Sequence, residues 1–207
     1  MPKGKVCKIH YFAEEGKVNL NKTISYVKER AVLLGITKVI VFTSEGEGPR
    51  KAIESFKGTS VQIIAVTFPS DDDSPRIDEQ TRAYLHDNRV NIVQGTLPFE
   101  EIIIPNTADV KLRTIRETLS LLSGGLALCV EAIIMATDAD YVTQGERVIA
   151  MSADTAIVAL AVRKKWLFAP WGMQIQQIIC KPENLTLKTK ELDTVAKGAI
   201  NLDMVEE

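Results

Sequence analysis

The sequence has 207 residues, of which 45% are hydrophobic and 25% are charged, a composition typical of a globular protein long enough to bury a core. The net charge of −2 argues against a nucleic-acid partner, since Arg163-Lys164-Lys165 is too short a basic run to form a binding surface. Three scattered cysteines without a CxxC pair argue against a disulfide scaffold and a zinc site. Because the sequence contains no membrane-spanning apolar run and no hydrophobic signal segment at its N-terminus, we expect a cytoplasmic protein without a membrane partner.

Strands and helices alternate through the first half of the chain. Runs of apolar and β-branched residues predict four strands, at 6–12, 39–42, 61–68 and 90–93. Helical spacing of apolar residues predicts three helices between them, one from a cap at Asn19 or Asn21 to Gly35, one from Pro49 to about Phe56, and one over 77–85. The charged stretch 71–75 reads as a loop, and 94–109 as irregular structure. This alternation favours right-handed βαβ units and a largely parallel sheet.

The second half is predicted to begin with two helices. An apolar stripe over 112–122 indicates an amphipathic helix, and 126–139 is apolar nearly all round, which is typical of a buried helix. Strands follow at 148–151, 155–162 and 176–180, the first two as a hairpin, and the spacing over 192–202 is compatible with a small C-terminal helix. We therefore predict one domain over 1–207, an α/β fold with a mostly parallel, mixed sheet.

The turn after strand 39–42 is the clearest candidate binding site. It carries Thr43, Ser44 and Gly46 ahead of a helix, so hydroxyl and backbone N–H groups could face a phosphate there, with Arg50 supplying positive charge. The alternative is a simple strand-to-helix turn in which Thr43 or Ser44 caps the helix. Both interpretations fit the residues.

Four segments together resemble an uncharacterised, mainly prokaryotic family of stand-alone relatives of the pyruvate kinase C-terminal domain. They are 43–48, 129–139, 148–156 and 178–182. The resemblance covers about residues 5–182 and leaves 183–207 as a C-terminal extension. It implies a three-layer α/β/α sandwich without the catalytic barrel of pyruvate kinase, and hence no phosphoryl transfer from phosphoenolpyruvate. In pyruvate kinases the corresponding loop binds the phosphate of a sugar-phosphate effector. In the stand-alone family the implied ligand is a phosphorylated nucleotide, with flavin mononucleotide (FMN) as the candidate.

The sequence departs from the family pattern at two places. Glu45 and Glu47 stand in the first loop, where each carboxylate is expected to repel a phosphate by about 1 kcal/mol at water-like screening. A glycine-rich segment that the family carries before Ala153-Asp154-Thr155 is missing. A minority alternative has the two glutamates hold a divalent cation that bridges to phosphate; apart from that, no metal site is predicted.

Further candidate ligand contacts come from the second half. Gly124 and Gly125 open the buried helix, where a ligand could approach the backbone, although a tight turn between two helices fits their spacing better. Glu131 is a carboxylate on that helix, which either bonds a ligand hydroxyl, acts as a base, or is satisfied structurally. Asp154 and Thr155 are assigned to polar groups of the ligand, with a turn role as the alternative.

Three functions remain open on the sequence alone. The first is a protein that binds a phosphorylated small molecule, and the second is an enzyme, either flavin-dependent or processing a phosphorylated metabolite, with Glu131 as acid or base. The third is a scaffold or regulatory subunit that binds no ligand. The two histidines lie in no catalytic motif. The aromatic segment 166–171 could stack on a planar ring, but a contact between subunits of a homo-oligomer fits it better.

Overall fold

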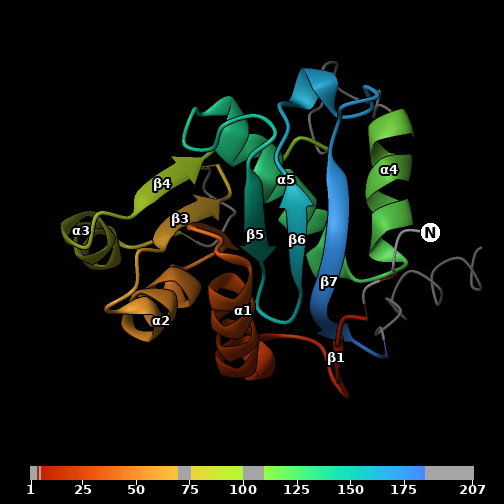
Figure 1. Ribbon diagram of the computed structural model, residues 1–207. Coiled ribbons are helices and arrows are strands. Elements are labelled where there is room, and N and C mark those ends of the chain that lie inside the picture. The colour runs from red at the N-terminus through yellow and green to blue at the C-terminus, as the bar shows by residue number, and fades with distance from the viewer. Residues whose placement is uncertain (1–3, 5, 70–75, 100–109, 185–207) are drawn as a thin grey trace, which may run out of the picture.

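Seven strands form one mixed sheet in the computed structural model, which describes residues 4, 6–69, 76–99 and 110–184 (Figure 1). Their order across the sheet is β1-β7-β6-β5-β2-β3-β4. Strand β6 runs antiparallel to its two neighbours, and the other four pairings are parallel, which confirms the predicted mostly parallel, mixed sheet. The strands are β1 (His10–Phe12), β2 (Lys38–Phe42), β3 (Gln62–Thr67), β4 (Asn91–Gln94), β5 (Arg147–Met151), β6 (Ala156–Leu160) and β7 (Gln174–Pro182).

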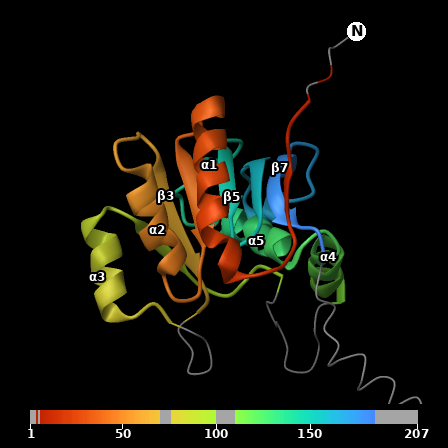
Figure 2. The same cartoon turned by 90° about the horizontal axis from the view of Figure 1, so that it is seen from below.

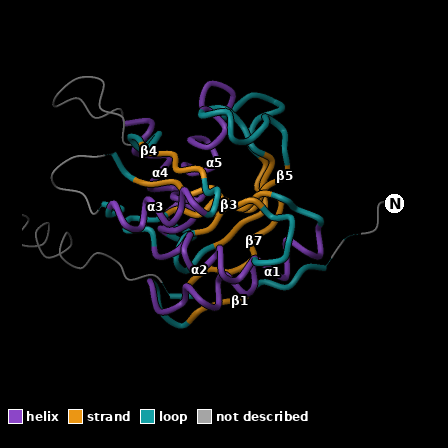
Figure 3. The backbone as a smooth tube through the Cα atoms, turned by 90° about the vertical axis from the view of Figure 1, so that its left-hand side faces the viewer, coloured by secondary structure: helices purple, strands orange, loops and turns teal. Residues whose placement is uncertain are grey.

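Helices cover both faces of this sheet, so the three-layer α/β/α sandwich is confirmed (Figures 2 and 3). Apolar side chains of α1, α2 and α3 pack on one face against Val39 and Val41, while α5 packs on the other face against Ile40 and Ile64, with α4 beside it. The helices are α1 (Leu20–Leu34), α2 (Glu47–Phe56), α3 (Glu79–Asp87), α4 (Val110–Ser120) and α5 (Gly124–Asp138), with short 3₁₀ turns η1 (Lys17–Asn19) and η2 (Lys164–Trp166).

Most element types follow the sequence pattern, and α5 is buried nearly all round as predicted. Gly35 ends α1 in the left-handed conformation, which glycine adopts at little cost. Asn19 precedes α1 but does not cap it with its side chain, because η1 leads directly into the helix and the amide donates to the Glu14 carbonyl at 2.6 Å. Helix α2 begins two residues before Pro49. The missing N–H of proline is still harmless there, because N–H groups in the first turn of a helix have no intrahelical carbonyl to bond.

The two strands at one edge of the sheet, β1 and β7, differ most from the prediction in length. Strand β1 has three residues where seven were predicted, while β7 has nine and starts at Gln174. The predicted loop at 71–75, most of the irregular stretch 94–109 and the candidate helix at 192–202 lie outside the described residues. Among the residues that are described, no helix is both long and apolar enough to cross a membrane.

The topology brings several helix starts to one edge of the sheet. The parallel strands β2, β3 and β5 end at the same edge. Helix α2, which follows β2, lies on one face of the sheet, and helix α5, which precedes β5, lies on the other. In open α/β sheets, ligands bind outside the carboxyl ends of the strands at such a switch point. The carboxyl ends of the paired strands β2 and β5 are therefore where a site is expected.

Candidate functional site

A pocket of about 290 Å³ lies at the carboxyl ends of β2 and β5. Three helices begin around it, since the first residues of α1 and α2 and the second residue of α5 line it. Its walls combine hydroxyls, one buried carboxylate and an apolar side. The lining residues are Lys17, Leu20, Phe42, Thr43, Ser44, Glu45, Glu47, Gly48, Phe68, Gly125, Leu128, Ser152, Ala153 and Asp154.

The turn from β2 to α2 forms one wall. Thr43 Oγ1 accepts a hydrogen bond from the Gly46 N–H at 2.9 Å, which closes the turn. Gly46 has φ of +90°, and a Cβ on it would lie 2.5 Å from Thr81 Cγ2 of α3. The residue is thus a glycine because of backbone conformation and packing on α3, and its N–H is already used within the turn. Thr43 and Ser44 both line the pocket, and Ser44, which is half-buried, is the more exposed of the two.

The floor is the hairpin turn between β5 and β6, organised by Asp154. Its Oδ2 accepts from the Gly16 N–H at 2.7 Å, and its Oδ1 accepts from Thr155 Oγ1 at 2.9 Å and from Ser152 Oγ at 3.4 Å. These bonds tie the segment before α1 to the hairpin, 138 residues away along the chain. Buried carboxylates require such donors. Asp154 lines the pocket, whereas Thr155 is buried behind it.

The start of α5 packs directly on this floor. Ser123 caps the helix by accepting from the Gly125 N–H at 3.1 Å, and its Oγ lies 2.6 Å from Thr155 Oγ1. A Cβ on Gly125 would lie 2.4 Å from Ser152 Oγ and 2.5 Å from Thr155 Oγ1. Glycine here allows the helix to approach the hairpin, which explains one of the two predicted glycines. Gly124 is exposed, has no neighbour within 4 Å of a Cβ, and does not line the pocket.

The two glutamates at the rim each have a lysine partner. Lys17 Nζ lies 2.7 Å from a Glu45 carboxylate oxygen, and Lys51 Nζ lies 2.8 Å from Glu47. The hydrogen bond with Glu45 raises the pKa of Lys17, and the hydrogen bond from Lys51 lowers the pKa of Glu47. Both carboxylates were expected from the sequence to repel a phosphate at this place. The paired lysines offset them, although exposed pairs of this kind are weak and exchangeable.

Two predicted site residues lie elsewhere. Arg50 is exposed in the groove between α1, α2 and α3, with its guanidinium carbon 5.2 Å from the centre of the Tyr84 ring. Glu131 is fully buried, and its Oε1 accepts from the Phe99 N–H at 3.0 Å. Neither residue lines the pocket. Of the nine predicted residues, the structure brings Thr43, Ser44, Gly125 and Asp154 together around it.

Several lining residues were not predicted from the sequence. Phe42 and Phe68 contact edge to face, with ring centres 5.1 Å apart, and together with Leu128 they form the apolar side. Phe68 follows β3 directly and Ser152 follows β5, so their positions at strand ends were an available signal, because parallel strands end at one edge of the sheet. Lys17 had no such signal, since its place at the rim depends on how the segment before α1 folds.

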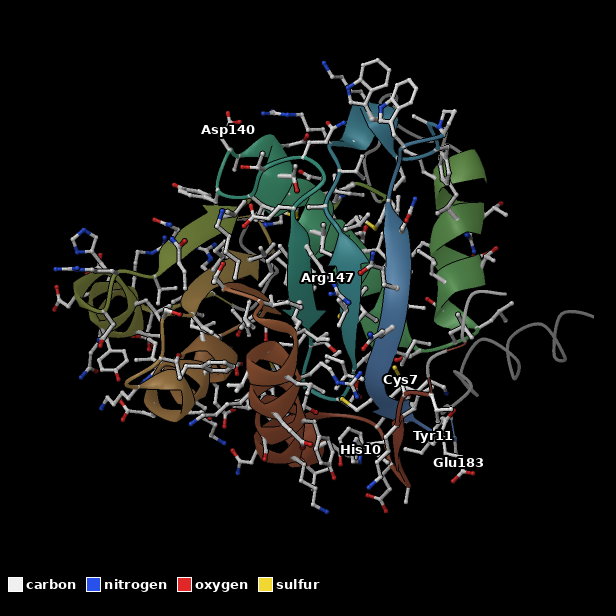
Figure 4. All side chains as sticks on the ribbon, viewed as in Figure 1. Cys7, His10, Tyr11, Asp140, Arg147 and Glu183 are labelled. Atoms are coloured by element: carbon white, nitrogen blue, oxygen red, sulfur yellow. The ribbon has the colours of Figure 1, made fainter. Side chains whose placement is uncertain are left out.

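The remaining reactive groups lie apart from this pocket. His10 lies at the start of β1 (Figure 4). Its ring stacks on Tyr26 with ring centres 3.7 Å apart, and His86 is exposed on α3. Burial raises the pKa of the Cys129 thiol well above its usual value and that of Cys180 to about 12, so both remain protonated thiols. In the part of the chain that the structure describes, no group of three or more His, Cys, Asp or Glu residues is arranged to hold a metal.

Comparison with known proteins gives pyruvate kinases as structural neighbours. No protein-family model matches the chain. A pyruvate kinase from Cryptosporidium parvum is 14% identical over 72% of this chain and 24% of its own length, with a TM-score of 0.37. A Cryptosporidium parvum pyruvate kinase in complex with ADP is 14% identical over 80% of this chain and 24% of its own length, with a TM-score of 0.34. A third structure, also of a pyruvate kinase from Cryptosporidium parvum, is 15% identical over 64% of this chain and 20% of its own length, with a TM-score of 0.32. The chain spans about a quarter or less of the length of these enzymes.

Proposed function

We propose that this protein binds a phosphorylated small molecule in the pocket at the carboxyl ends of β2 and β5, with FMN as the first candidate. The observation that carries the proposal is the convergence of three helix starts on one pocket. Each helix start presents the positive end of its dipole, which favours an anion. The first residues of α2 add N–H groups without intrahelical partners, whereas the Gly125 N–H of α5 is bonded to Ser123 Oγ and the Leu20 N–H of α1 to the Lys17 carbonyl. The resemblance of the chain to the stand-alone family supplies the candidate.

The lining suggests how such a ligand would lie. The phosphate is assigned to Ser44 and the first turn of α2, where the hydroxyl and the helix dipole meet. Asp154 and Ser152 on the floor are acceptors suited to ligand hydroxyls, and Phe42 and Phe68 offer an apolar surface to a ring. About 290 Å³ is at the lower end for small-molecule sites, so part of a nucleotide would remain at the mouth.

We propose no reaction for this site. The enzyme hypothesis gave Glu131 the role of acid or base, and its carboxylate lies outside the pocket lining with one oxygen bound to the Phe99 N–H. The described residues form an open sheet rather than a barrel, so we expect no turnover of phosphoenolpyruvate from this chain.

The proposal is tested by titrating FMN and following flavin fluorescence. Ser44→Tyr fills the pocket from its half-buried wall, and we expect a loss of affinity of at least tenfold. Ser25→Tyr makes the same change on the exposed surface of α1, outside the pocket, and should leave affinity unchanged. Gly46 is not suitable for this test, because any side chain there meets Thr81 and the strained backbone. Equal affinity of the wild type and Ser44→Tyr would refute the proposed site, and lack of FMN binding by both would refute FMN as the ligand.

A further inference from the structure

The pocket at the carboxyl ends of β2 and β5 has a basic side chain at its rim. Among the described residues that line this pocket, Lys17 is the only lysine or arginine. Sequence proximity pointed to Arg50 for the positive charge, but Arg50 lies in the neighbouring groove against Tyr84. Within the described part of the pocket wall, Lys17 is therefore the side chain that can supply positive charge to a phosphate.

Hydrogen bonds on both sides of Lys17 hold its backbone at this rim. Before it, the Gly16 N–H donates to Asp154 Oδ2 at 2.7 Å, which ties the segment to the floor of the pocket. After it, the Asn19 N–H donates to the Gly16 carbonyl at 3.1 Å, and the Asn19 side-chain amide donates to the Glu14 carbonyl at 2.6 Å. Figure 2 shows this segment running from β1 to the start of α1. Because its backbone is already fixed, Lys17 loses less conformational entropy when its side chain binds a ligand.

The side chain of Lys17, in contrast, is free to change its partner. Its Nζ lies 2.7 Å from a Glu45 carboxylate oxygen, but the two side chains are 62% and 55% exposed. Exposed pairs of this kind contribute little to stability, because water and salt screen them. A phosphomonoester offers more negative charge and more acceptor oxygens than one carboxylate does. It can therefore displace Glu45 from the ammonium group, and the displaced carboxylate can turn to water.

The ammonium group also stands close along the chain to the position assigned to the phosphate. Glu45 directly follows Ser44, and both line the pocket with Glu47, the first residue of α2. A movement of Lys17 Nζ from Glu45 toward Ser44 brings it to the phosphate position. The charge of Glu47 is offset separately, because Lys51 Nζ lies 2.8 Å from its carboxylate.

We infer that Lys17 binds the phosphate of the ligand by exchanging Glu45 for it, and that this exchange makes the site selective for phosphomonoesters. The inference rests on the proposed function, because it concerns the same pocket. The hydroxyls and helix starts of the pocket can hold a neutral polar group as well as an anion, whereas the Lys17 ammonium favours the anion alone. Riboflavin tests this distinction, since it has the ring and ribityl chain of FMN without the phosphate.

The test compares the binding of FMN and riboflavin to the full chain by flavin fluorescence. Lys17→Met removes the charge and keeps a long side chain, so it should weaken FMN binding at least about tenfold and change riboflavin binding less than about twofold. Lys17→Arg keeps the charge and should bind FMN within about threefold of the wild type. Lys57→Met is the matched control, because Lys57 is also an exposed lysine paired with a carboxylate, that of Glu54, and lies outside the pocket. It should leave both affinities unchanged.

Salt provides a second measurement, which a merely structural role of Lys17 would not change. FMN binding by the wild type should weaken between about 50 mM and about 500 mM potassium chloride, and the dependence should be smaller in Lys17→Met. Equal FMN affinity of the wild type and Lys17→Met would overturn the inference and leave the proposed function standing. Equal losses for FMN and riboflavin would also overturn it, because Lys17 would then shape the rim instead of binding phosphate. A wild type that binds neither FMN nor inorganic phosphate would refute the proposed function and this inference with it.

Discussion

Gly125→Ala tests whether the pocket is shaped by close approach of α5 to the β5–β6 hairpin. An added Cβ would lie 2.4 Å from Ser152 Oγ, 2.5 Å from Thr155 Oγ1 and 2.7 Å from Thr155 Cβ. Ser152 Oγ can rotate away, but Thr155 Cβ belongs to a buried turn, so the helix or the hairpin must shift. Overpacking of this kind costs about 1–3 kcal/mol.

Gly124→Ala is the matched control for this change. It lies one residue earlier in the same helical turn, and its Cβ would meet nothing within 4 Å. Both alanines gain the same small advantage of alanine over glycine in a helix, so this term cancels in the comparison. We therefore expect Gly125→Ala to be less stable than Gly124→Ala by about 1–3 kcal/mol in urea denaturation. A difference below about 0.5 kcal/mol, or one of opposite sign, would refute the packing argument.

Four further outcomes follow from the described contacts. Ser123→Ala removes the cap of α5 and the partner of Thr155, both buried, and should lower the free energy of unfolding by about 1–3 kcal/mol, measured by denaturation. The Cys180 pKa of about 12 lies above the usual value of 9, so the folded state holds its proton more tightly; stability should fall as pH rises from 9 to 12, and Cys180→Ala should flatten that slope. At pH 8, thiol reagents should modify exposed Cys7 and spare Cys180 until unfolding. Glu45→Gln should release Lys17 toward a bound anion and raise FMN affinity about threefold to tenfold, whereas weaker binding would show that the pair orders the rim.

Local pattern in the sequence accounts for most of the fold. Apolar runs predicted the central strands, and Gly35 marked the end of α1, because these signals depend on neighbouring residues alone. The length of β7 was missed because three of its first four residues are glutamines, so the apolar pattern that indicates a strand is weak there. The length of β1 was overestimated because only the last three residues of the predicted segment 6–12 pair with β7.

The candidate site was less predictable because its contacts join distant segments. The turn residues Thr43 and Ser44 were found from the strand-turn-helix order, which is local. The Lys17–Glu45 pair and the bond from Gly16 to Asp154 depend on how the segment before α1 crosses the sheet, and no pattern near either residue reveals them. Arg50 was placed at the phosphate by sequence proximity, yet the helical turn directs it toward Tyr84.

Native and denaturing mass spectrometry of the purified protein, combined with its absorbance spectrum, tests the central proposal most directly. The proposed function predicts a bound small molecule that carries a phosphate, leaves on denaturation and is absent from Ser44→Tyr, with flavin absorption if the ligand is FMN. A protein that carries no such molecule and takes up neither FMN nor inorganic phosphate on incubation would contradict it. That result would leave the scaffold hypothesis, with Glu45 and Glu47 at the rim as the physical reason.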